Sequence, residues 1–233
     1  MIVRRGAGDT RKMPRDSANE IDPEQLLKAY TLGYFPMARR RCDKTVVWVL
    51  PDIRGVLELR EARLPKKLRR LIARASFEIR VDTAFPAVIR ACAEPGPGRR
   101  DTWINEPIEQ VYCELHRRGF AHSVECYDDG ALVGGLYGVA LGGVFCGESM
   151  FSRRDNASKV ALAHLIARLR IGGFQLLDTQ FHTAHLAQFG VAEMRNADYQ
   201  ARLEPALAAH GDFYRGGASL STTTVLQSIT QTS

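Results

Sequence analysis

A single carboxylate stands among apolar residues near the middle of the chain. Glu148 follows Val144 and Phe145, and it precedes Met150 and Phe151. A carboxylate in apolar surroundings is unfavourable unless a cation or a hydrogen-bond donor compensates for its lost hydration. The pattern therefore marks Glu148 as a residue that holds a cationic or donor partner.

A second acidic residue stands at the end of a predicted strand. Asp178 follows Leu176 and Leu177, and Gln180 comes two residues later, on the same face if the strand continues. The ends of strands commonly carry the working groups of α/β proteins. Asp178 and Gln180 are accordingly the pair that we expect to carry chemistry.

Between these positions the sequence indicates the start of a helix. Asp155 or Asn156 is expected to cap it, and Ser158 and Lys159 fall in its first turn, where free N–H groups favour a negative ligand. An ordinary helix start explains the same residues without any ligand.

The cysteines and histidines give weaker signals. Cys146 has no neighbouring His or Lys in the sequence that would activate it as a nucleophile. His182 and His185 are three apart, but a zinc site needs further ligands and none is spaced nearby. The five cysteines contain no C-x-x-C pair and are odd in number, which argues against a zinc site and a disulfide framework. We therefore expect no metal and no cofactor.

The chain has two tryptophans, and each stands at a transition between predicted elements. Trp48 precedes the segment VLPDIR, and Trp103 lies in DTWIN. Buried aromatic residues are most often plain core. Both side chains also have the character to line a pocket for a base or for an apolar side chain.

Positive charge is concentrated in one segment. The net charge is +6, and residues 54–74 alone hold eight Lys or Arg against two Glu. Leu68, Leu71 and Ile72 are spaced to bury one helix face. The helix would leave five cations exposed, namely Lys66, Lys67, Arg69, Arg70 and Arg74. Such a surface suits a polyanion such as RNA, although a solvated helix face has the same composition.

The remaining pattern defines the elements that must position these residues. Helices are predicted over 22–33, 83–93, 105–119 and 157–171, with a short one at 182–190 and a closing one at 196–210. Strands are predicted at 45–50, 55–59, 76–82 and 174–180, and residues 121–149 are predicted to form three antiparallel strands with turns at 129–130 and 142–143. This order favours an α+β fold with a mixed, mainly antiparallel sheet.

Composition sets the domain organisation that we expect. The chain of 233 residues is 45% hydrophobic and 25% charged, as in an ordinary globular protein. It has no apolar run long enough to span a bilayer and no signal-peptide pattern, so we expect a cytoplasmic protein without membrane contact. We predict a polar, disordered tail at 1–20, a small N-terminal α/β domain at 21–75, a larger domain at 76–215 and a flexible Ser/Thr-rich tail at 216–233.

Several motifs together resemble one known family. The segments PEQLLKAYTLGYFPM, WVLPDIRGVL, VFCGESMFSRRDNASKVAL and LLDTQFHTAHLAQFG occur in the order found in leucyl/phenylalanyl-tRNA–protein transferases, from about Pro23 to Leu203. The block FCGESMFS with NASK is the most specific part. The family pattern usually reads W-W-x-P, whereas Trp48 is followed here by Val49.

The resemblance implies an acetyltransferase-like (GNAT-like) fold for the larger domain and a defined reaction. Leu, Phe or sometimes Met would pass from aminoacyl-tRNA to proteins that begin with Arg or Lys, which marks them for degradation. In this interpretation Asp178 and Gln180 are catalytic, and the basic helix binds tRNA. The substrate-binding residues would be Trp48, Trp103, Glu148, Ser149, Met150 and Leu165. The enzyme would need no metal or nucleotide and would act as a monomer.

Two other classes of protein remain open from the residues alone. An N-acyltransferase that uses acyl-CoA would need a pyrophosphate loop of the form Q/R-x-x-G-x-G/A before a helix, and the segment SRRDNASK lacks it. An RNA-binding module without catalysis would tolerate replacement of Asp178.

Overall fold

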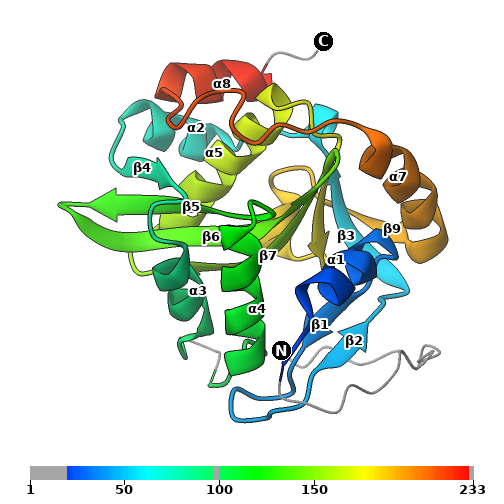
Figure 1. Ribbon diagram of the computed structural model, residues 1–233. Coiled ribbons are helices and arrows are strands. Elements are labelled where there is room, and N and C mark those ends of the chain that lie inside the picture. Colours follow the sequence, from blue (N-terminus) through cyan, green and yellow to red (C-terminus); the bar gives the residue numbers. More distant parts are fainter. Residues whose placement is uncertain (1–19, 97–99, 231–233) are drawn as a thin grey trace.

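A mixed sheet of seven strands forms the centre of the structure, a computed structural model that describes residues 20–96 and 100–230 (Figure 1). The strands lie in the order β4 (Glu78–Val81), β5 (Ala121–Asp128), β6 (Ala131–Leu141), β7 (Val144–Ser152), β8 (Leu176–Gln180), β3 (Ile53–Glu58) and β9 (Ala192–Arg195). Only β7 and β8 run parallel, and the other neighbours are antiparallel. The mixed, mainly antiparallel sheet is confirmed, whereas the acetyltransferase-like fold remains a prediction.

The three consecutive strands β5, β6 and β7 follow from their turn residues. Asp129 and Gly130 both have positive φ angles in the first turn, and Gly142 has one in the second. Tight hairpin turns require this backbone region, which Gly and Asp adopt more readily than most residues. The predicted pair of hairpins is therefore confirmed.

A β-bulge interrupts β7 at Glu148. Tyr137 of β6 lies opposite Ser149 and the next residue, Gly138, lies opposite Gly147, so Glu148 is one residue in excess. A bulge re-aims the side chains that follow it. Cys146 before the bulge packs in the core on one face of the sheet, and Met150 after it packs against the core on the other face.

Each face of the sheet carries its own layer of helices. One face is covered by α1 (Pro23–Thr31), α3 (Phe85–Ala93), α4 (Glu106–Arg117) and α7 (Asn196–Ala208). The other is covered by α5 (Ala157–Ile171), with α2 (Lys66–Ala73) and α8 (Thr222–Thr230) packed beside it. The side chains of Asp22 and Asn105 cap α1 and α4 by accepting backbone N–H groups. The two cores are called here the first core, under α1, α3, α4 and α7, and the second core, under α5.

The N-terminal part contributes more to the large sheet than expected. A separate two-stranded ribbon consists of β1 (Phe35–Met37) and β2 (Val47–Val49). The N-terminal domain predicted at 21–75 includes β3 together with β1 and β2. In the structure, β3 instead lies between β8 and β9 in the large sheet. Its successive residues Val56 and Leu57 are buried in the first and second cores, which only a strand inside a covered sheet can achieve.

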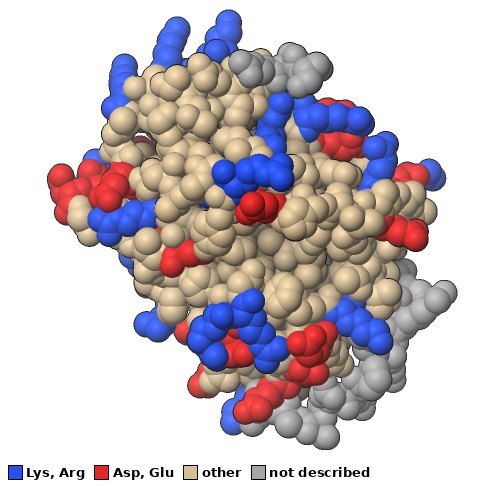
Figure 2. Space-filling model, turned by 45° about the horizontal axis from the view of Figure 1, so that its top comes forward, with Lys and Arg blue, Asp and Glu red and all other residues tan. Residues whose placement is uncertain are grey.

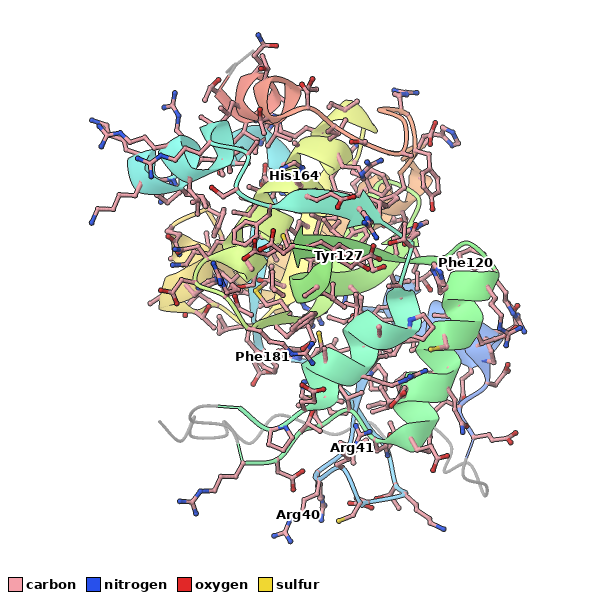
Figure 3. All side chains as sticks on the ribbon, turned by 90° about the vertical axis from the view of Figure 1, so that its left-hand side faces the viewer. Arg40, Arg41, Phe120, Tyr127, His164 and Phe181 are labelled. Atoms are coloured by element: carbon pink, nitrogen blue, oxygen red, sulfur yellow. The ribbon has the colours of Figure 1, made fainter. Side chains whose placement is uncertain are left out.

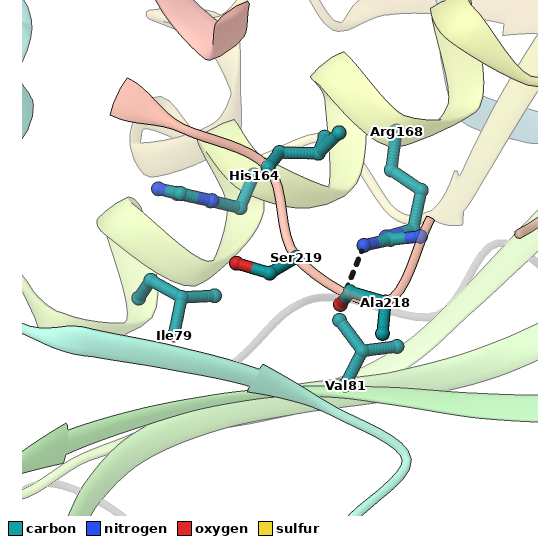
Figure 4. Close-up of a pocket in the computed structure, with 7 residues that line it drawn as sticks. Ile79, Val81, His164, Arg168, Ala218 and Ser219 are labelled. Atoms are coloured by element: carbon teal, nitrogen blue, oxygen red, sulfur yellow. Dashed lines mark hydrogen bonds between the residues drawn. The ribbon is translucent and has the colours of Figure 1, made fainter. Parts of the chain in front are cut away.

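The predicted flexible tail at 216–233 is wrong over most of its length. It contains α8, whose Val225 and Ile229 lie four residues apart and are buried against α5 and α2. The buried guanidinium of Arg168 in α5 donates hydrogen bonds to the carbonyls of Phe213 and Gly217 and so holds the preceding segment. It also donates to the carbonyl of Ala218 (Figure 4). The Ser/Thr-rich composition suggested disorder, although Val225 and Ile229 are spaced to form one apolar face of a helix. The predicted tail at 1–20 lies outside the described residues, apart from Glu20.

Two short elements complete the chain, and one predicted cap differs. The 3-10 helix η1 spans Leu59–Glu61, and α6 spans Ala184–Ala187. Neither Asp155 nor Asn156 caps α5; instead the hydroxyl of Ser152 accepts the Ser158 N–H at 3.3 Å. In the part of the chain that the structure describes, no helix has the length and apolar character needed to cross a membrane.

Candidate active site

The site lies where the two parallel strands part. β7 and β8 pair at Val144, Phe145 and Cys146, the last opposite Asp178. Beyond this pair β7 continues through its bulge, while β8 ends two residues later at Gln180. The side chains that face this point come from α1, α4, β3, β7, β8 and α7.

Glu148 is surrounded by hydrogen-bond donors. The hydroxyl of Tyr30 lies 2.7 Å from Oε1, and that of Tyr112 lies 2.9 Å from Oε2. The side-chain amide of Gln180 donates to Oε1 at 3.1 Å. The two tyrosine oxygens are also in contact with each other at 2.5 Å. The expected donor partners of Glu148 are therefore present in the protein itself.

The surroundings of Glu148 raise the pKa of its carboxyl into the neutral range. Burial is the main cause that raises the pKa of this carboxyl, to about 7, and the charge of Asp178 acts in the same direction. Hydrogen bonds from Tyr30 and Tyr112 lower the pKa and offset part of this rise. Burial also raises the pKa of both tyrosines well above the usual range, so they remain donors. Glu148 can gain or lose a proton near neutral pH.

Asp178 is held by three donors and is only 1% exposed. Its Oδ2 accepts from Arg54 Nη1 at 2.5 Å and from the Tyr199 hydroxyl at 2.9 Å. Its Oδ1 accepts the backbone N–H of Gln180 at 2.9 Å. The carboxylate therefore fixes the turn that carries Gln180.

Arg54 is buried, although the basic segment around it in the sequence suggests a surface residue. We counted it in the basic segment, but it is 1% exposed and ion-paired with Asp178. Its guanidinium carbon lies 4.2 Å from the centre of the Tyr199 ring, and Nη2 donates to the carbonyl of Gly33. Burial is the largest single influence and lowers the pKa of Arg54. The charge of Asp178, smaller contributions from Tyr199 and Cys146, and the hydrogen bond to Asp178 together outweigh burial, so the pKa is raised. β3 points this residue into the first core, so it is no phosphate ligand.

Gln180 adopts a left-handed backbone conformation, with φ of 54°. The chain turns sharply here, and Gly55 of β3 makes room because a Cβ atom would lie 2.6 Å from the backbone of Phe181 and His182. Strained backbone of this kind is often found at functional sites. After the turn, Phe181 is 46% exposed and its ring packs edge-on against Phe35 at 5.8 Å (Figure 3).

The structure brings together only part of the predicted substrate set. Trp48 and Trp103 pack against the first core, on the side of Glu148 and its tyrosines. Met150 packs against the second core, and Leu165 is buried within it. Ser149 lies opposite Tyr137 in the strand register. The two tryptophans and the two aliphatic residues thus lie on opposite faces of the sheet.

The other reactive side chains do not form a second centre. Burial, with the charges of Asp178 and Glu148, raises the pKa of the Cys146 thiol well above its usual range, so it stays protonated. His182 Nδ1 lies 3.8 Å from Glu193, and the His185 ring lies 6.2 Å from that of Phe189. Among the described residues, no three His, Cys, Asp or Glu side chains converge as metal ligands.

The predicted basic helix is exposed as expected. Leu68 and Ile72 are buried under α2, and the cationic residues Lys66, Lys67, Arg69, Arg70 and Arg74 face solvent. Figure 2 shows Lys and Arg side chains projecting at the upper left of the molecule, where α2 lies. Within the described residues, none of the five forms a salt bridge.

Sequence reasoning missed Tyr30, Tyr112, Arg54 and Tyr199 as site residues. Tyrosines on the buried face of an amphipathic helix resemble ordinary core residues, and Arg54 resembles one more surface cation in its basic segment. The signal that was present is their position in motifs, since Tyr30 lies in PEQLLKAYTLGYFPM and Arg54 in WVLPDIRGVL.

Comparison with known proteins places the chain among the aminoacyltransferases. The family model "Leucyl/phenylalanyl-tRNA protein transferase" matches residues 56–204, and the model of that family's N-terminal domain matches residues 19–52. Curated proteins named leucyl/phenylalanyl-tRNA–protein transferase are similar throughout. The one from Phenylobacterium zucineum is 56% identical over 86% of this chain and 90% of its own length. The one from Caulobacter vibrioides is 53% identical over 94% and 100%, respectively.

The chain therefore belongs to the leucyl/phenylalanyl-tRNA–protein transferase family. A solved structure, L-PGS from Bacillus licheniformis, aligns with 88% of this chain and 69% of its own at 14% identity and a TM-score of 0.40, which is too weak to support an inference.

Proposed function

We propose that the protein transfers Leu or Phe from aminoacyl-tRNA to the α-amine of proteins that begin with Arg or Lys, and so marks them for degradation. Membership of the family supports the reaction class. The observation that carries the proposal to this chain is the connected set Asp178, Gln180 and Glu148 at the point where β7 and β8 part.

The chemistry asks mainly for positioning. An aminoacyl ester is already activated, and an α-amine with a pKa of about 7.7–8.0 is partly neutral near pH 7. Attack of the amine on the ester carbonyl then depends on holding the two reactants together. No metal, nucleotide or covalent enzyme intermediate is required.

In this proposal Asp178 orients the site rather than taking the proton itself. Its oxygens already accept hydrogen bonds from Arg54, Tyr199 and the Gln180 backbone. Gln180 is thereby held with its side chain toward Glu148 and can position the ester or the amine. The carboxylate of Glu148 gives a cationic acceptor an anionic group at the reaction centre.

The surrounding surfaces would receive the rest of the substrates. The exposed cations of α2 would bind tRNA phosphates. Trp48 and Trp103, on the same face of the sheet as Glu148, would contact the aminoacyl end, together with Ser149 beside Glu148. Met150 and Leu165 pack in the second core on the other face and are not part of this proposal. We further propose that the enzyme acts in the cytoplasm as a monomer.

The test is incubation with Phe-tRNA or Leu-tRNA and a peptide that begins with Arg, followed by mass measurement. A mass increase of one Leu or Phe residue is expected, and an N-acetylated peptide should remain unchanged. Acetylation from acetyl-CoA without tRNA would instead place the protein in the acyl-CoA class. Binding of tRNA without any transfer would favour an RNA-binding module.

A further inference from the structure

The Glu148 carboxyl and the hydroxyls of Tyr30 and Tyr112 form a closed ring of contacts. Tyr30 and Tyr112 touch each other at 2.5 Å, and each touches a different oxygen of the Glu148 carboxyl, at 2.7 and 2.9 Å. The tyrosines come from α1 and α4, so the ring is built from three distant parts of the chain. Glu148 as a whole residue is half-buried.

The number of hydrogens in this ring depends on the charge of Glu148. When Glu148 is ionised, both tyrosine hydroxyls donate to the carboxylate, since it is the strongest acceptor. The hydroxyl oxygens of Tyr30 and Tyr112 lie 2.5 Å apart. In the ionised state no hydrogen lies between them, because each hydroxyl hydrogen points to the carboxylate. The ionised ring has three contacts and two hydrogens.

One added proton completes the ring. With the hydrogen on Oε2, Glu148 donates to Tyr112, Tyr112 donates to Tyr30, and Tyr30 donates to Oε1. Oε1 remains an acceptor and can also keep its bond from Gln180. All contacts are then satisfied, so the protein is arranged to receive a proton at Glu148.

We propose that Glu148 is the proton acceptor of the transfer reaction, and that Tyr30 and Tyr112 are the positioning residues that prepare it. This proposal rests on the proposed function. As the acceptor's nitrogen bonds to the ester carbonyl carbon, one N–H proton passes to Glu148. When the bond from that carbon to the ribose oxygen of tRNA breaks, the same proton passes to the leaving oxygen. The products are an amide and a free ribose hydroxyl, and Glu148 is ionised again.

The groups that face Glu148 from the packed elements allow this role. Among the described residues they are Tyr30, Tyr112, Tyr137, Cys146, Arg54 and Asp178. The tyrosines and the thiol stay neutral, and the charges of Arg54 and Asp178 are paired with each other. Glu148 is therefore the group among these whose charge changes near neutral pH.

The decisive measurement is the pH dependence of kcat/KM for an Arg-initiated peptide with saturating Phe-tRNA. Native enzyme needs both a neutral amine and an ionised Glu148, so log(kcat/KM) should rise with a slope approaching two in acid. In Glu148→Gln only the amine titrates, so the slope should be one, with the rate at pH 7.5 lower by roughly 10²–10⁴-fold. Glu109→Gln on α4, whose carboxylate forms surface ion pairs, should behave as native.

The positioning role is tested by removing single hydroxyls. Tyr30→Phe and Tyr112→Phe each remove a donor from the ionised carboxylate, so the acid limb should move to higher pH and the loss of rate should be larger at pH 7 than at pH 9. Tyr137→Phe is the matched control, because the Tyr137 hydroxyl is buried in the same core without a hydrogen-bond partner among the described residues. An equal shift in all three variants would indicate a packing effect and overturn the positioning role.

Infrared difference spectra of the free enzyme between pH 6 and 8 give a readout without substrate. We expect the native enzyme to show a carboxylic-acid band at pH 6 that disappears by pH 8. The same band should be missing from Glu148→Gln at both pH values. No transfer by native enzyme would reject the proposed function. Transfer with a native slope of one, or an unimpaired Glu148→Gln enzyme, would reject Glu148 as the proton acceptor and leave the proposed function standing.

Discussion

At the scale of single residues, the buried ion pair of Arg54 and Asp178 changes what a substitution at Asp178 should do. Asp178→Asn keeps the shape of the side chain but leaves a buried guanidinium without its counter-charge. Breaking one side of such a pair typically costs about 3–5 kcal/mol. We expect the variant to lose about 3 kcal/mol of unfolding free energy, measured by urea denaturation, and to transfer at least about 10²-fold more slowly.

The control for this prediction is Asp198→Asn, which weakens an exposed ion pair with Arg195. Its stability should change by less than about 1 kcal/mol. If Asp178→Asn is as stable as native protein, the pair with Arg54 does not stabilise the fold.

The titration of Glu148 should make the free energy of unfolding decrease as the pH rises. Its pKa is raised from 4.5 to about 7 in the folded protein, so the folded state binds a proton that the unfolded state has released between these values. This contribution is fully present below about pH 4.5 and is lost as the pH rises through 7. Relative to Glu148→Gln, native protein should therefore lose up to about 2–3 kcal/mol of unfolding free energy between pH 5 and 8.

Urea midpoints of both proteins at pH 5, 6, 7 and 8 provide the measurement, because titration of all other groups cancels in the difference. A constant difference across this range would show that Glu148 does not titrate as a raised carboxyl.

The residues at the centre of the site were predictable to different degrees. Glu148, Asp178 and Gln180 were found because carboxylates beside apolar residues are costly and have a reason to be there. Tyr30 and Tyr112 were not, because a helix that buries Leu26 and Ala29 accepts a tyrosine as ordinary core. Only the three-dimensional meeting of α1, α4 and β7 shows that their hydroxyls serve a carboxyl group.

At the scale of elements, the exposed cations of α2 lead to a separate prediction about tRNA binding. Replacing Lys66, Lys67, Arg69 and Arg70 with Ala should weaken tRNA binding and reduce its dependence on salt by about 0.7–0.9 in log–log slope per lost phosphate contact. The reason is that each contact releases condensed counterions from the nucleic acid.

Binding isotherms between 50 and 300 mM salt test this, with Arg117→Ala and Arg118→Ala on α4 as a control for lost charge on another helix. Those two arginines are engaged with acidic neighbours, including Glu114. An unchanged slope in the α2 variant would make that helix a solvated face without a role in binding.

Most elements were predicted from local signals, including the short β2 and α6, whereas β1 and β9 were not. Capped helices and hairpins with Asp-Gly or Gly-Gly turns are recorded in a few adjacent residues. β1 and β9 have three and four residues, and β9 is mostly exposed, so neither shows a hydrophobic alternation. The bulge at Glu148 could not be predicted for a different reason. A bulge is defined by the register of β7 against its partner β6, which the sequence of β7 alone does not determine.

At the scale of the whole molecule, the C-terminal segment should be needed for stability. Ending the chain after Gly217 removes α8 and uncovers the surface of α5 and α2 against which Val225 and Ile229 are buried. Burial of two such side chains is worth roughly 3–6 kcal/mol. We expect a loss of that size in urea denaturation.

The transfer rate of the shortened protein, measured well below its melting temperature, should stay near native, because α8 covers the face of the sheet opposite to Tyr30 and Tyr112. Full-length protein with Thr223→Ala, an exposed-side change within α8, is the control for altered helix propensity. A shortened chain of native stability would show that α8 adds nothing to the fold.

The pairing of Arg54 with Asp178 also sets when the enzyme becomes complete during its synthesis. The two residues are 124 positions apart, and Tyr199, which closes over the same carboxylate, comes 21 positions later still. A growing chain on the ribosome therefore carries Arg54 without its counter-charge until residue 178 has emerged, and without Tyr199 for 21 residues more. Under the proposed function, in which the enzyme modifies the first residue of other proteins, it would thus have no working site while its own Asp178 and Tyr199 are still to be made.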